Sequence, residues 1–246
     1  MYWSHQIERG RPAERKRNLL DLLRLTLGAV ELSSTRREAM SSVAAGASPK
    51  WLPGGVSDHK HAVYETSVVF DFTQLAAHDF ASHSNEAVWE RPLTYLPAGA
   101  TYWRRISIDL SLFSATRNVE TRIEFGRAKP KSRPTLRDEK LEEDAGKLFD
   151  ARVARLAAKD DPDPSRLDVE NFIILWDERH SEQSREAKLT VNRGEVWLDR
   201  CQQYAQAATT RLNGPTVTLE GVAASSLMTL EPRTHRTAFA ALYAIE

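Results

Sequence analysis

Apolar and polar side chains alternate with a period of two over two neighbouring segments in the middle of the chain. The first segment runs from Trp103 to Phe113 and the second from Val119 to Phe125, and the residues SATRN between them suit a turn. The apolar positions are Ile106, Ile108, Leu110, Leu112, Val119, Ile123 and Phe125. A period of two is typical of a strand with one buried face, so this pattern predicts a hairpin of two half-buried strands.

Helical spacing of apolar residues and helix-capping residues predict further elements. Leucines recur at helical intervals between Ala13 and Val30, and a capping-box pattern begins a second helix over residues 36–45. A third helix follows Pro134, with Thr135 as its cap and Asp138 at the reciprocal position, and extends to about Lys159. Shorter patterns predict helical turns over residues 73–82 and a helix over residues 196–212.

Runs of β-branched and aromatic residues predict the remaining strands. Two of these runs are VYETSVVFDF over residues 63–72 and NFIILW over residues 171–176. We also predict a strand or turn near Leu189 and strands over residues 216–221 and 237–245. NFIILW is a short continuous apolar run, which is typical of a central strand.

The order of these elements indicates an α+β fold. Residues 61–180 are predicted to form a ferredoxin-like β-α-β-β-α-β core with an antiparallel sheet. Residues 1–60 form a helical N-terminal segment before it, and residues 181–246 form a smaller C-terminal α/β unit after it. With the N-terminal helix counted instead, the same elements also approximate the order α-β-β-β-α-β, and the pattern does not separate the two orders.

Composition narrows the function classes only slightly. The 34 basic and 34 acidic residues balance, so no overall charge attracts nucleic acid or anionic lipid. Charge is uneven locally, because residues 1–50 hold nine basic and five acidic residues. Cys201 is the only cysteine and is predicted to be a buried, inert thiol. No apolar stretch has the length of a membrane helix and no signal core begins the chain, so we expect a cytoplasmic protein without a membrane partner. Nucleotide-cofactor and common hydrolase motifs are absent from the sequence.

Two carboxylates on the polar face of the predicted hairpin are candidate metal ligands. Asp109 and Glu124 can lie opposite or diagonal to each other, where they could hold a divalent metal for phosphodiester cleavage. The arrangement resembles the core of restriction-type nucleases from about Trp103 to Trp176, with the family's lysine position occupied by Gly126. Lys129 is out of strand register with Glu124. The alternative is a solvent-facing sheet surface on which Asp109, Glu124, Arg105 and Arg122 pair across strands.

Clustered basic residues suggest contacts to a phosphate chain. The β-α-β-β-α-β order and scattered arginines resemble the repeat-associated RNA-binding proteins of CRISPR systems, which include guide-processing endonucleases. That resemblance implies metal-independent cleavage, with Arg24, Arg37, His59 and His61 as candidate catalytic residues. The candidate nucleic-acid-binding residues are Arg36, Arg104, Arg105, Arg127, Lys129, Lys131, Arg133, Arg233, His235 and Arg236.

Three functions are therefore predicted, in order of preference. The first is an RNA-binding subunit of a ribonucleoprotein that can also be an endoribonuclease, with no cofactor or metal and with other protein subunits as partners. The second is a metal-dependent DNA nuclease that uses Asp109 and Glu124. The third is a non-catalytic interaction subunit of a larger complex.

Overall fold

The computed structural model describes residues 2–6, 19–29, 65–81, 85–97, 99–114, 119–128, 138–153, 155–156, 168–182, 186–227 and 234–246. The elements in these ranges are β1 (Tyr2–Gln6), a helix over residues 19–29, α2 (Glu65–Ala81), β2 (Asn85–Leu96), β3 (Arg104–Ser114), β4 (Val119–Arg127), α3 (Glu139–Val153), β5 (Arg155–Leu156), β6 (Asp168–Glu182), α4 (Glu186–Arg211), β7 (Val217–Leu227) and β8 (Thr234–Ile245). None of the helices in these ranges is both long and apolar enough to cross a membrane.

The strands of the described residues form a single eight-stranded sheet in the order β1-β7-β8-β6-β4-β3-β2-β5. Neighbouring strands are antiparallel except β4 and β6, which run parallel from Val119 opposite Asp168 to Arg127 opposite Trp176. Parallel neighbours need a crossover connection, and α3 lies in the connection between β4 and β6. The fold class is therefore α+β with a mixed sheet.

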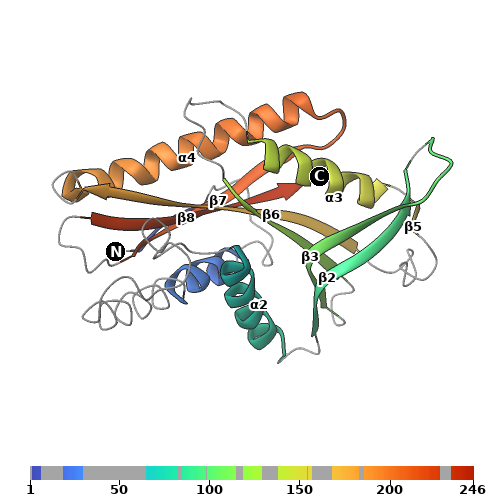
Figure 1. Ribbon diagram of the computed structural model, residues 1–246, viewed down its shortest axis with the longest axis horizontal. Coiled ribbons are helices and arrows are strands. Elements are labelled where there is room, and N and C mark those ends of the chain that lie inside the picture. Colours follow the sequence, from blue (N-terminus) through green and yellow to red (C-terminus); the bar gives the residue numbers. More distant parts are fainter. Residues whose placement is uncertain are drawn as a thin grey trace, which may run out of the picture.

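Helices cover both faces of this sheet (Figure 1). The helix over residues 19–29 and α2 lie on one face, and α3 and α4 lie on the other. On the first face, the ring of Phe72 in α2 contacts Phe125 of β4 edge to face, with ring centroids 5.4 Å apart. On the second face, Leu148 of α3 and Trp197 of α4 belong to one apolar cluster with Leu175 of β6. Strands at the centre of the sheet are consequently buried on both faces.

Several predicted elements are present. The hairpin predicted from the alternating pattern is β3 and β4, and the run NFIILW lies in β6, where all six residues are buried. The predicted strands near the C-terminus are β7 and β8. Cys201 is buried in α4, as predicted.

The strand predicted over residues 63–72 is wrong, because α2 occupies residues 65–81. Val68, Val69, Phe72 and Ala76 are all buried on the face of α2 that packs against the sheet. Their spacing is also helical, and burial of this stripe outweighs the strand preference of the β-branched and aromatic residues, which is a weak and context-dependent effect. The hydroxyl of Thr73 donates to the carbonyl of Val69 at 2.7 Å within the same helix.

Three other elements differ from the prediction. The segment near Leu189 is not a strand or turn but part of α4, and β2 was not predicted at all. The predicted helix 135–159 is α3, which begins at Glu139 and ends at Val153, and Asp138 caps it; Thr135 lies outside the described residues. The carboxylate of Asp138 accepts a hydrogen bond from the backbone N–H of Leu141 at 3.0 Å, as an N-cap does.

The ferredoxin-like β-α-β-β-α-β order is not confirmed. Residues 61–180 contain α2, β2, β3, β4, α3, β5 and β6, which is the α-β-β-β-α-β order with the two-residue strand β5 inserted before the last strand. Strands β7 and β8, from the segment predicted as a C-terminal unit, pair in the same sheet as β6. The predicted helix over residues 36–45 and the rest of the linker to residue 60 lie outside the described residues.

The hairpin of β2 and β3 bends at Glu90 and Asp109. Trp89 pairs with Leu110 and Arg91 pairs with Ile108, but the intervening pair of Glu90 and Asp109 is missing from the ladder. Glu90 has a φ of 47°, in the left-handed region. On its other side β3 pairs with β4 only from Leu110 onwards, so the hairpin separates from β4 on the N-terminal side of that residue (Figure 1). We call the part beyond the bend, residues 91–108, the hairpin arm.

We expect replacement of Glu90 by glycine to stabilise the protein. A residue with a side chain pays about 1 kcal/mol to adopt the left-handed region, whereas glycine adopts it without steric cost. Part of that gain is lost because glycine increases the conformational entropy of the unfolded chain. The free energy of unfolding in urea should rise by about 0.5 kcal/mol for Glu90→Gly. The control is Glu86→Gly, at an exposed position of the same strand, which should lower it. Equal losses in the two variants would contradict strain at Glu90.

Candidate functional site

The polar face of β4 is covered by α3 and does not face solvent. Glu120, Arg122 and Glu124 alternate along the strand, and each is only 1% exposed. The sequence pattern predicted a half-buried strand, and this prediction is wrong because the crossover from β4 to β6 carries α3 across that face. Charged groups buried in this way need partners, since a bare charge in a protein interior is very costly.

Glu120 and Arg122 form a buried ion-pair network at one end of this face. Arg122 donates from Nε and from its second amino group to the two carboxylate oxygens of Glu120, at 2.9 and 3.0 Å. The hydroxyl of Ser111 and the guanidinium of Arg91 also donate to Glu120. These charged donors lower the pKa of Glu120 even though burial acts in the opposite direction. The network fixes β3, β4 and the base of the hairpin arm to one another.

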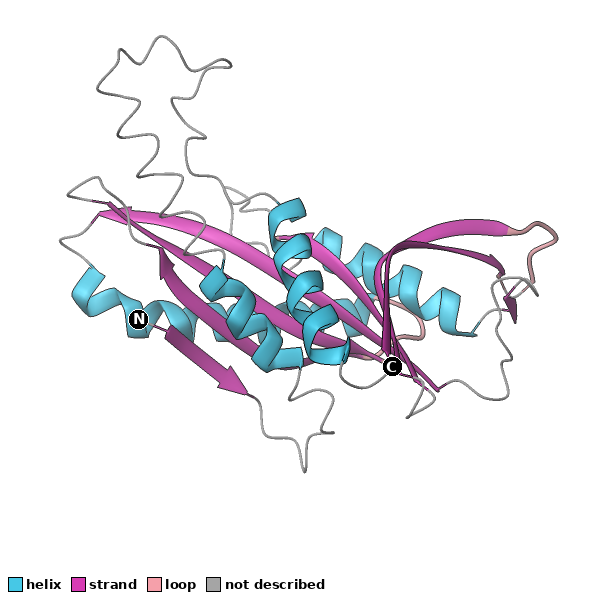
Figure 2. Ribbon diagram, turned by 90° about the horizontal axis from the view of Figure 1, so that it is seen from below, coloured by secondary structure: helices cyan, strands magenta, loops and turns pink. Residues whose placement is uncertain are grey.

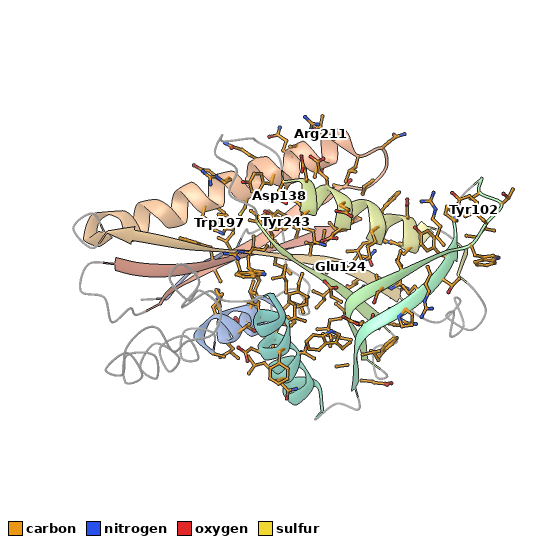
Figure 3. The ribbon with its side chains drawn as sticks, viewed as in Figure 1. Tyr102, Glu124, Asp138, Trp197, Arg211 and Tyr243 are labelled. Carbon is orange, nitrogen blue, oxygen red and sulfur yellow. The ribbon has the colours of Figure 1, made fainter. Side chains whose placement is uncertain are left out.

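Glu124 has a different environment, in which negative charges crowd together. Burial, followed by repulsion from Asp109, raises its pKa to about 8, and repulsion from Asp144 adds to the rise. Lys147 of α3 acts in the opposite direction, with its Nζ atom 2.7 Å from Oε1 of Glu124. Figure 3 shows Glu124 between α3 and the point where β3 and β4 separate. Three carboxylates therefore share a partly enclosed space with the Lys147 ammonium.

Asp109 contributes to this space from the bend in β3. Extending the β3–β4 register by one step beyond Leu110 and Ile123 places Asp109 directly opposite Glu124. The ladder does not continue there, and Oδ2 of Asp109 instead accepts a hydrogen bond from the backbone N–H of Phe125 at 2.8 Å. The Asp109 carboxylate thus replaces a backbone carbonyl as the acceptor for this N–H group, and this hydrogen bond keeps the carboxylate beside Glu124.

A second lysine of α3 reaches the same space above Gly126. Lys140 lies 2.9 Å from Oδ1 of the buried Asp144, and its positive charge interacts with both Asp109 and Glu124. A methyl group placed on Gly126 would come within 2.9 Å of Cγ of Lys140. The glycine thus leaves room for a lysine side chain that arrives from the helix, at the strand position where the restriction-type resemblance implies a lysine.

Asp144 completes the group of acidic residues. It is 2% exposed, and burial raises its pKa to about 6 despite Lys140 and Lys147. Its Oδ2 atom is buried and has no hydrogen-bond partner among the described residues. We call Asp109, Glu124, Asp144, Lys140 and Lys147 the acidic site.

The donor set of the acidic site fits a small divalent cation. Among the described residues no three His, Cys, Asp or Glu side chains are grouped as a complete metal-binding set. Mg²⁺ does not need such a set, because it keeps several waters and takes one or two carboxylates together with substrate phosphate oxygens. Asp109 and Glu124 would be those carboxylates, since a cation between them relieves the repulsion that, after burial, raises the pKa of Glu124.

The basic residues predicted for RNA binding are distributed differently. Arg24 is exposed and pairs with Asp21 of its own helix at 2.7 Å, and Arg127 lies over the ring of Trp176 at 5.1 Å from its centroid. Arg104 and Arg105 are exposed at the start of β3. His235 and Arg236 lie in β8, opposite Ser181 and His180. Outside the described residues lie Arg36, Arg37, His59, His61, Lys129, Lys131, Arg133 and Arg233.

Those that are described do not come together in one groove. The beginning of β8, which carries Arg236, and the beginning of β3, which carries Arg105, lie at opposite ends of the longest axis of the molecule (Figure 1). The structure brings Asp109 and Glu124 together and leaves Arg105 and Arg236 apart.

Sequence reasoning missed the three α3 residues of the acidic site. Lys140, Asp144 and Lys147 are spaced by four and three residues, so they share one side of the helix, next to the buried stripe of Leu141 and Leu148. A polar stripe bordering an apolar one was the available signal. It did not indicate which strand the helix would cover.

A separate cavity lies at the other end of α3. It has a volume of about 380 Å³ and is lined by Phe149 and Arg152 of α3, Asn171 of β6 and Ile245 of β8, among others. None of the acidic-site residues lines it. The candidate site is therefore the crowded group of charges at the strand separation rather than this cavity.

Comparisons of the chain with protein-family models, with curated protein sequences and with solved structures give no match. The geometry and charges of the acidic site are consequently the features that indicate a function.

Proposed function

We propose that this protein is a metal-dependent phosphodiesterase in which Asp109 and Glu124 hold a divalent cation. The single observation that carries the proposal is the pairing of these two carboxylates at the bend of β3, where repulsion from Asp109 contributes to the raised pKa of Glu124. A folded protein that holds two carboxyl groups side by side in a buried place gains stability from a cation that replaces the proton on one of them. Within this class, we propose a nuclease.

The chain order supports a nuclease in particular. The resemblance to restriction-type nucleases depends on a strand, a carboxylate strand, a helix and another strand. Among the described residues β3, β4, α3 and β6 follow in that order, with the two-residue β5 inserted before β6. The expected lysine is absent from the strand, and Lys140 supplies an ammonium group above Gly126. We infer that Lys140 supplies the positive charge that the restriction-type pattern has two positions after Glu124, where this chain has Gly126.

Each residue has a role that follows from its position. A divalent cation bound here would polarise a phosphoryl oxygen and lower the pKa of a bound water. Asp109 and Glu124 hold that cation, and Asp144 positions Lys140 through the 2.9 Å ion pair. The ammonium of Lys140 can stabilise negative charge that develops on the phosphoryl group. Lys147, 2.7 Å from Glu124, acts to lower the pKa of that carboxyl group and so favours its charged, cation-binding form.

The experiment is a cleavage assay on single-stranded and duplex DNA and on RNA, with Mg²⁺ or Mn²⁺ and then with a chelator. Cleavage that requires the metal supports the proposal. Cleavage that survives the chelator would instead support the metal-independent RNA-processing activity predicted from the sequence. The absence of cleavage on every polymer in the presence of metal contradicts a nuclease.

Lys140 offers a test that leaves both metal ligands in place. We expect Lys140→Met to lower the cleavage rate by about 10²-fold, the usual cost of removing one group that stabilises transition-state charge, with little change in metal affinity. Gly126→Ala should have a similar, smaller effect, because its methyl group would displace Lys140. The control is Lys147→Met, which should chiefly shift the pH dependence through Glu124. Unchanged cleavage in Lys140→Met would contradict the assigned role.

RNA binding by a ribonucleoprotein subunit stays a prediction. Arg104 and Arg105 are the exposed, neighbouring members of the predicted RNA-binding set among the described residues. Metal-dependent cleavage of RNA in the assay would support both RNA binding and nuclease activity in this protein.

A further inference from the structure

The hairpin arm, residues 91–108, is the most unusual surface of the described chain. It extends beyond the main body of the sheet, and its tip projects from the molecule (Figure 2). Tyr102 and Trp103 at the tip are 61% and 47% exposed. Figure 3 shows Tyr102 at the far end of the arm, distant from the core. Two large aromatic side chains exposed side by side usually mark a contact with a partner.

The charge of the arm is one-sided. Residues 91–108 contain three arginines and no Asp or Glu, in a chain where acidic and basic residues are equal in number. Arg91 forms an ion pair with the buried Glu120, whereas Arg104 and Arg105 are exposed. Arg104 lies over the ring of Tyr102 at 5.6 Å from its centroid and donates to its hydroxyl at 3.2 Å, which holds that ring in place. The arm therefore presents aromatic rings and positive charge together.

A short stretch of β3 connects this tip to the acidic site. Side chains alternate along a strand, so Arg105 and Ser107 lie on the face opposite Ile106 and Ile108, which pack with the apolar cluster of α3, and this alternation is interrupted at the bend, where Asp109 lies. Arg105 and Ser107 are exposed, and Asp109 is partly exposed. Four residues of extended chain separate Arg105 from Asp109, which corresponds to about 13 Å. Arg105 therefore lies within about 13 Å of Asp109 along β3, in the part of this strand that has no pairing with β4 among the described residues.

We propose that the hairpin arm binds a single-stranded segment of nucleic acid, with a base stacked on Trp103 or Tyr102 and a phosphate at Arg105, and guides it to the acidic site. Aromatic side chains stack on unpaired bases in a sequence-tolerant way, and arginines hold the backbone. A blunt duplex offers such stacking only at its ends. The cleavage of the guided strand depends on the proposed function, whereas its binding does not.

Binding is measured with a fluorescent single-stranded oligonucleotide of about 12 nucleotides, a length that covers one such binding site, in the presence of a chelator so that no cleavage occurs. We expect Trp103→Ala to raise the Kd by about 5- to 100-fold and Trp103→Phe to restore most of the binding. Arg105→Ala should weaken binding and lower the slope of log Kd against log salt by about one. A blunt duplex of the same sequence should bind more weakly than the single strand.

The controls are Trp89→Ala and Arg152→Ala. Trp89 is 40% exposed on β2 but lies before the bend, and Arg152 is exposed on α3. Neither variant should change the Kd by more than about twofold, since surface changes away from a site have small effects. Thermal unfolding of the arm variants should match that of the wild type, because Trp103 and Arg105 are exposed.

Unchanged binding in Trp103→Ala and Arg105→Ala would overturn the proposal and leave the tip as a protein contact. Equal affinity of single strand and blunt duplex would overturn base stacking. These outcomes are distinct from a failure of the proposed nuclease, which is seen as wild-type protein that binds the oligonucleotide through the arm but never cleaves it when metal is present. Conversely, if Trp103→Ala and Arg105→Ala cleave at the wild-type rate, the nuclease proposal stands and guidance of the strand by the arm is contradicted.

Discussion

Asp109→Asn should lower metal-dependent cleavage by about 10³-fold. A bound cation contributes several kcal/mol of charge stabilisation to phosphoryl transfer, and each 1.36 kcal/mol corresponds to a factor of ten in rate. Asparagine has nearly the same shape as aspartate, and its carbonyl oxygen can still accept the hydrogen bond from the N–H of Phe125. The loss would therefore report the missing charge rather than a disrupted bend.

The same variant provides a second and opposite measurement. Removing the charge of Asp109 relieves its repulsion of Glu124, so Asp109→Asn should be at least as stable as the wild type when no metal is present. Its stabilisation by added Mg²⁺, measured as the rise in Tm, should be lost. Asp150→Asn, at an exposed position of α3, is the control and should retain both cleavage and the Mg²⁺ effect. If Asp109→Asn cleaves at the wild-type rate, Asp109 does not hold the metal.

Glu124→Gln should remove most of the pH dependence of stability between pH 6 and 9. The pKa of Glu124 is raised from 4.5 to about 8, mainly by burial. Between these two values the folded protein holds a proton that the unfolded chain has released, so the free energy of unfolding falls as the pH rises. The stabilisation is complete below the unfolded value and is lost above about pH 8, and at 1.36 kcal/mol per pH unit it reaches about 5 kcal/mol at most.

Urea unfolding at pH 6, 7.5 and 9 with a chelator present measures this effect. The wild type should lose several kcal/mol across the series, whereas Glu124→Gln, which has no proton to release, should change much less. Glu143→Gln, at an exposed position of α3, is the matched control and should follow the wild type. Parallel losses in the wild type and Glu124→Gln would show that Glu124 does not carry the pH dependence.

Metal binding should change with pH in the opposite direction. A cation competes with the proton on Glu124, so the stabilisation by Mg²⁺ should increase as the pH rises towards and beyond about 8. Removing the metal with a chelator should consequently lower the Tm more at pH 8.5 than at pH 6. This link between proton and cation would explain the presence of a buried carboxylate that weakens the metal-free protein.

An element of the fold could be predicted when the residues that determine it lie within one short segment of the sequence. The alternating residues of β3 and β4 and the apolar run in β6 are fixed by side-chain periodicity, which a single segment displays. Residues 63–72 were predicted wrongly because their β-branched and aromatic side chains suit a strand, while Val68 and Phe72 are also spaced for a helix. Only packing against the sheet decides between the two.

The candidate site shows the same division. Asp109 and Glu124 could be chosen from the sequence because a hairpin places opposite residues together. Lys140, Asp144 and Lys147 could not be assigned to them, since the helix that carries these residues reaches the site only through the crossover from β4 to β6. The bend at Glu90 also has no clear signature, because glutamate seldom adopts the left-handed region.

The sequence by itself determined the class of the fold, the central hairpin and strand, and the pair of carboxylates, because each of these follows from the periodicity of a short segment. The tertiary structure alone decided that α3 covers the polar face of β4 and that Lys140 lies above Gly126. It also decided that the hairpin arm separates from β4 at Asp109. The physical reason is that periodicity specifies which side of an element is buried, whereas the identity of the covering element depends on contacts between distant parts of the chain.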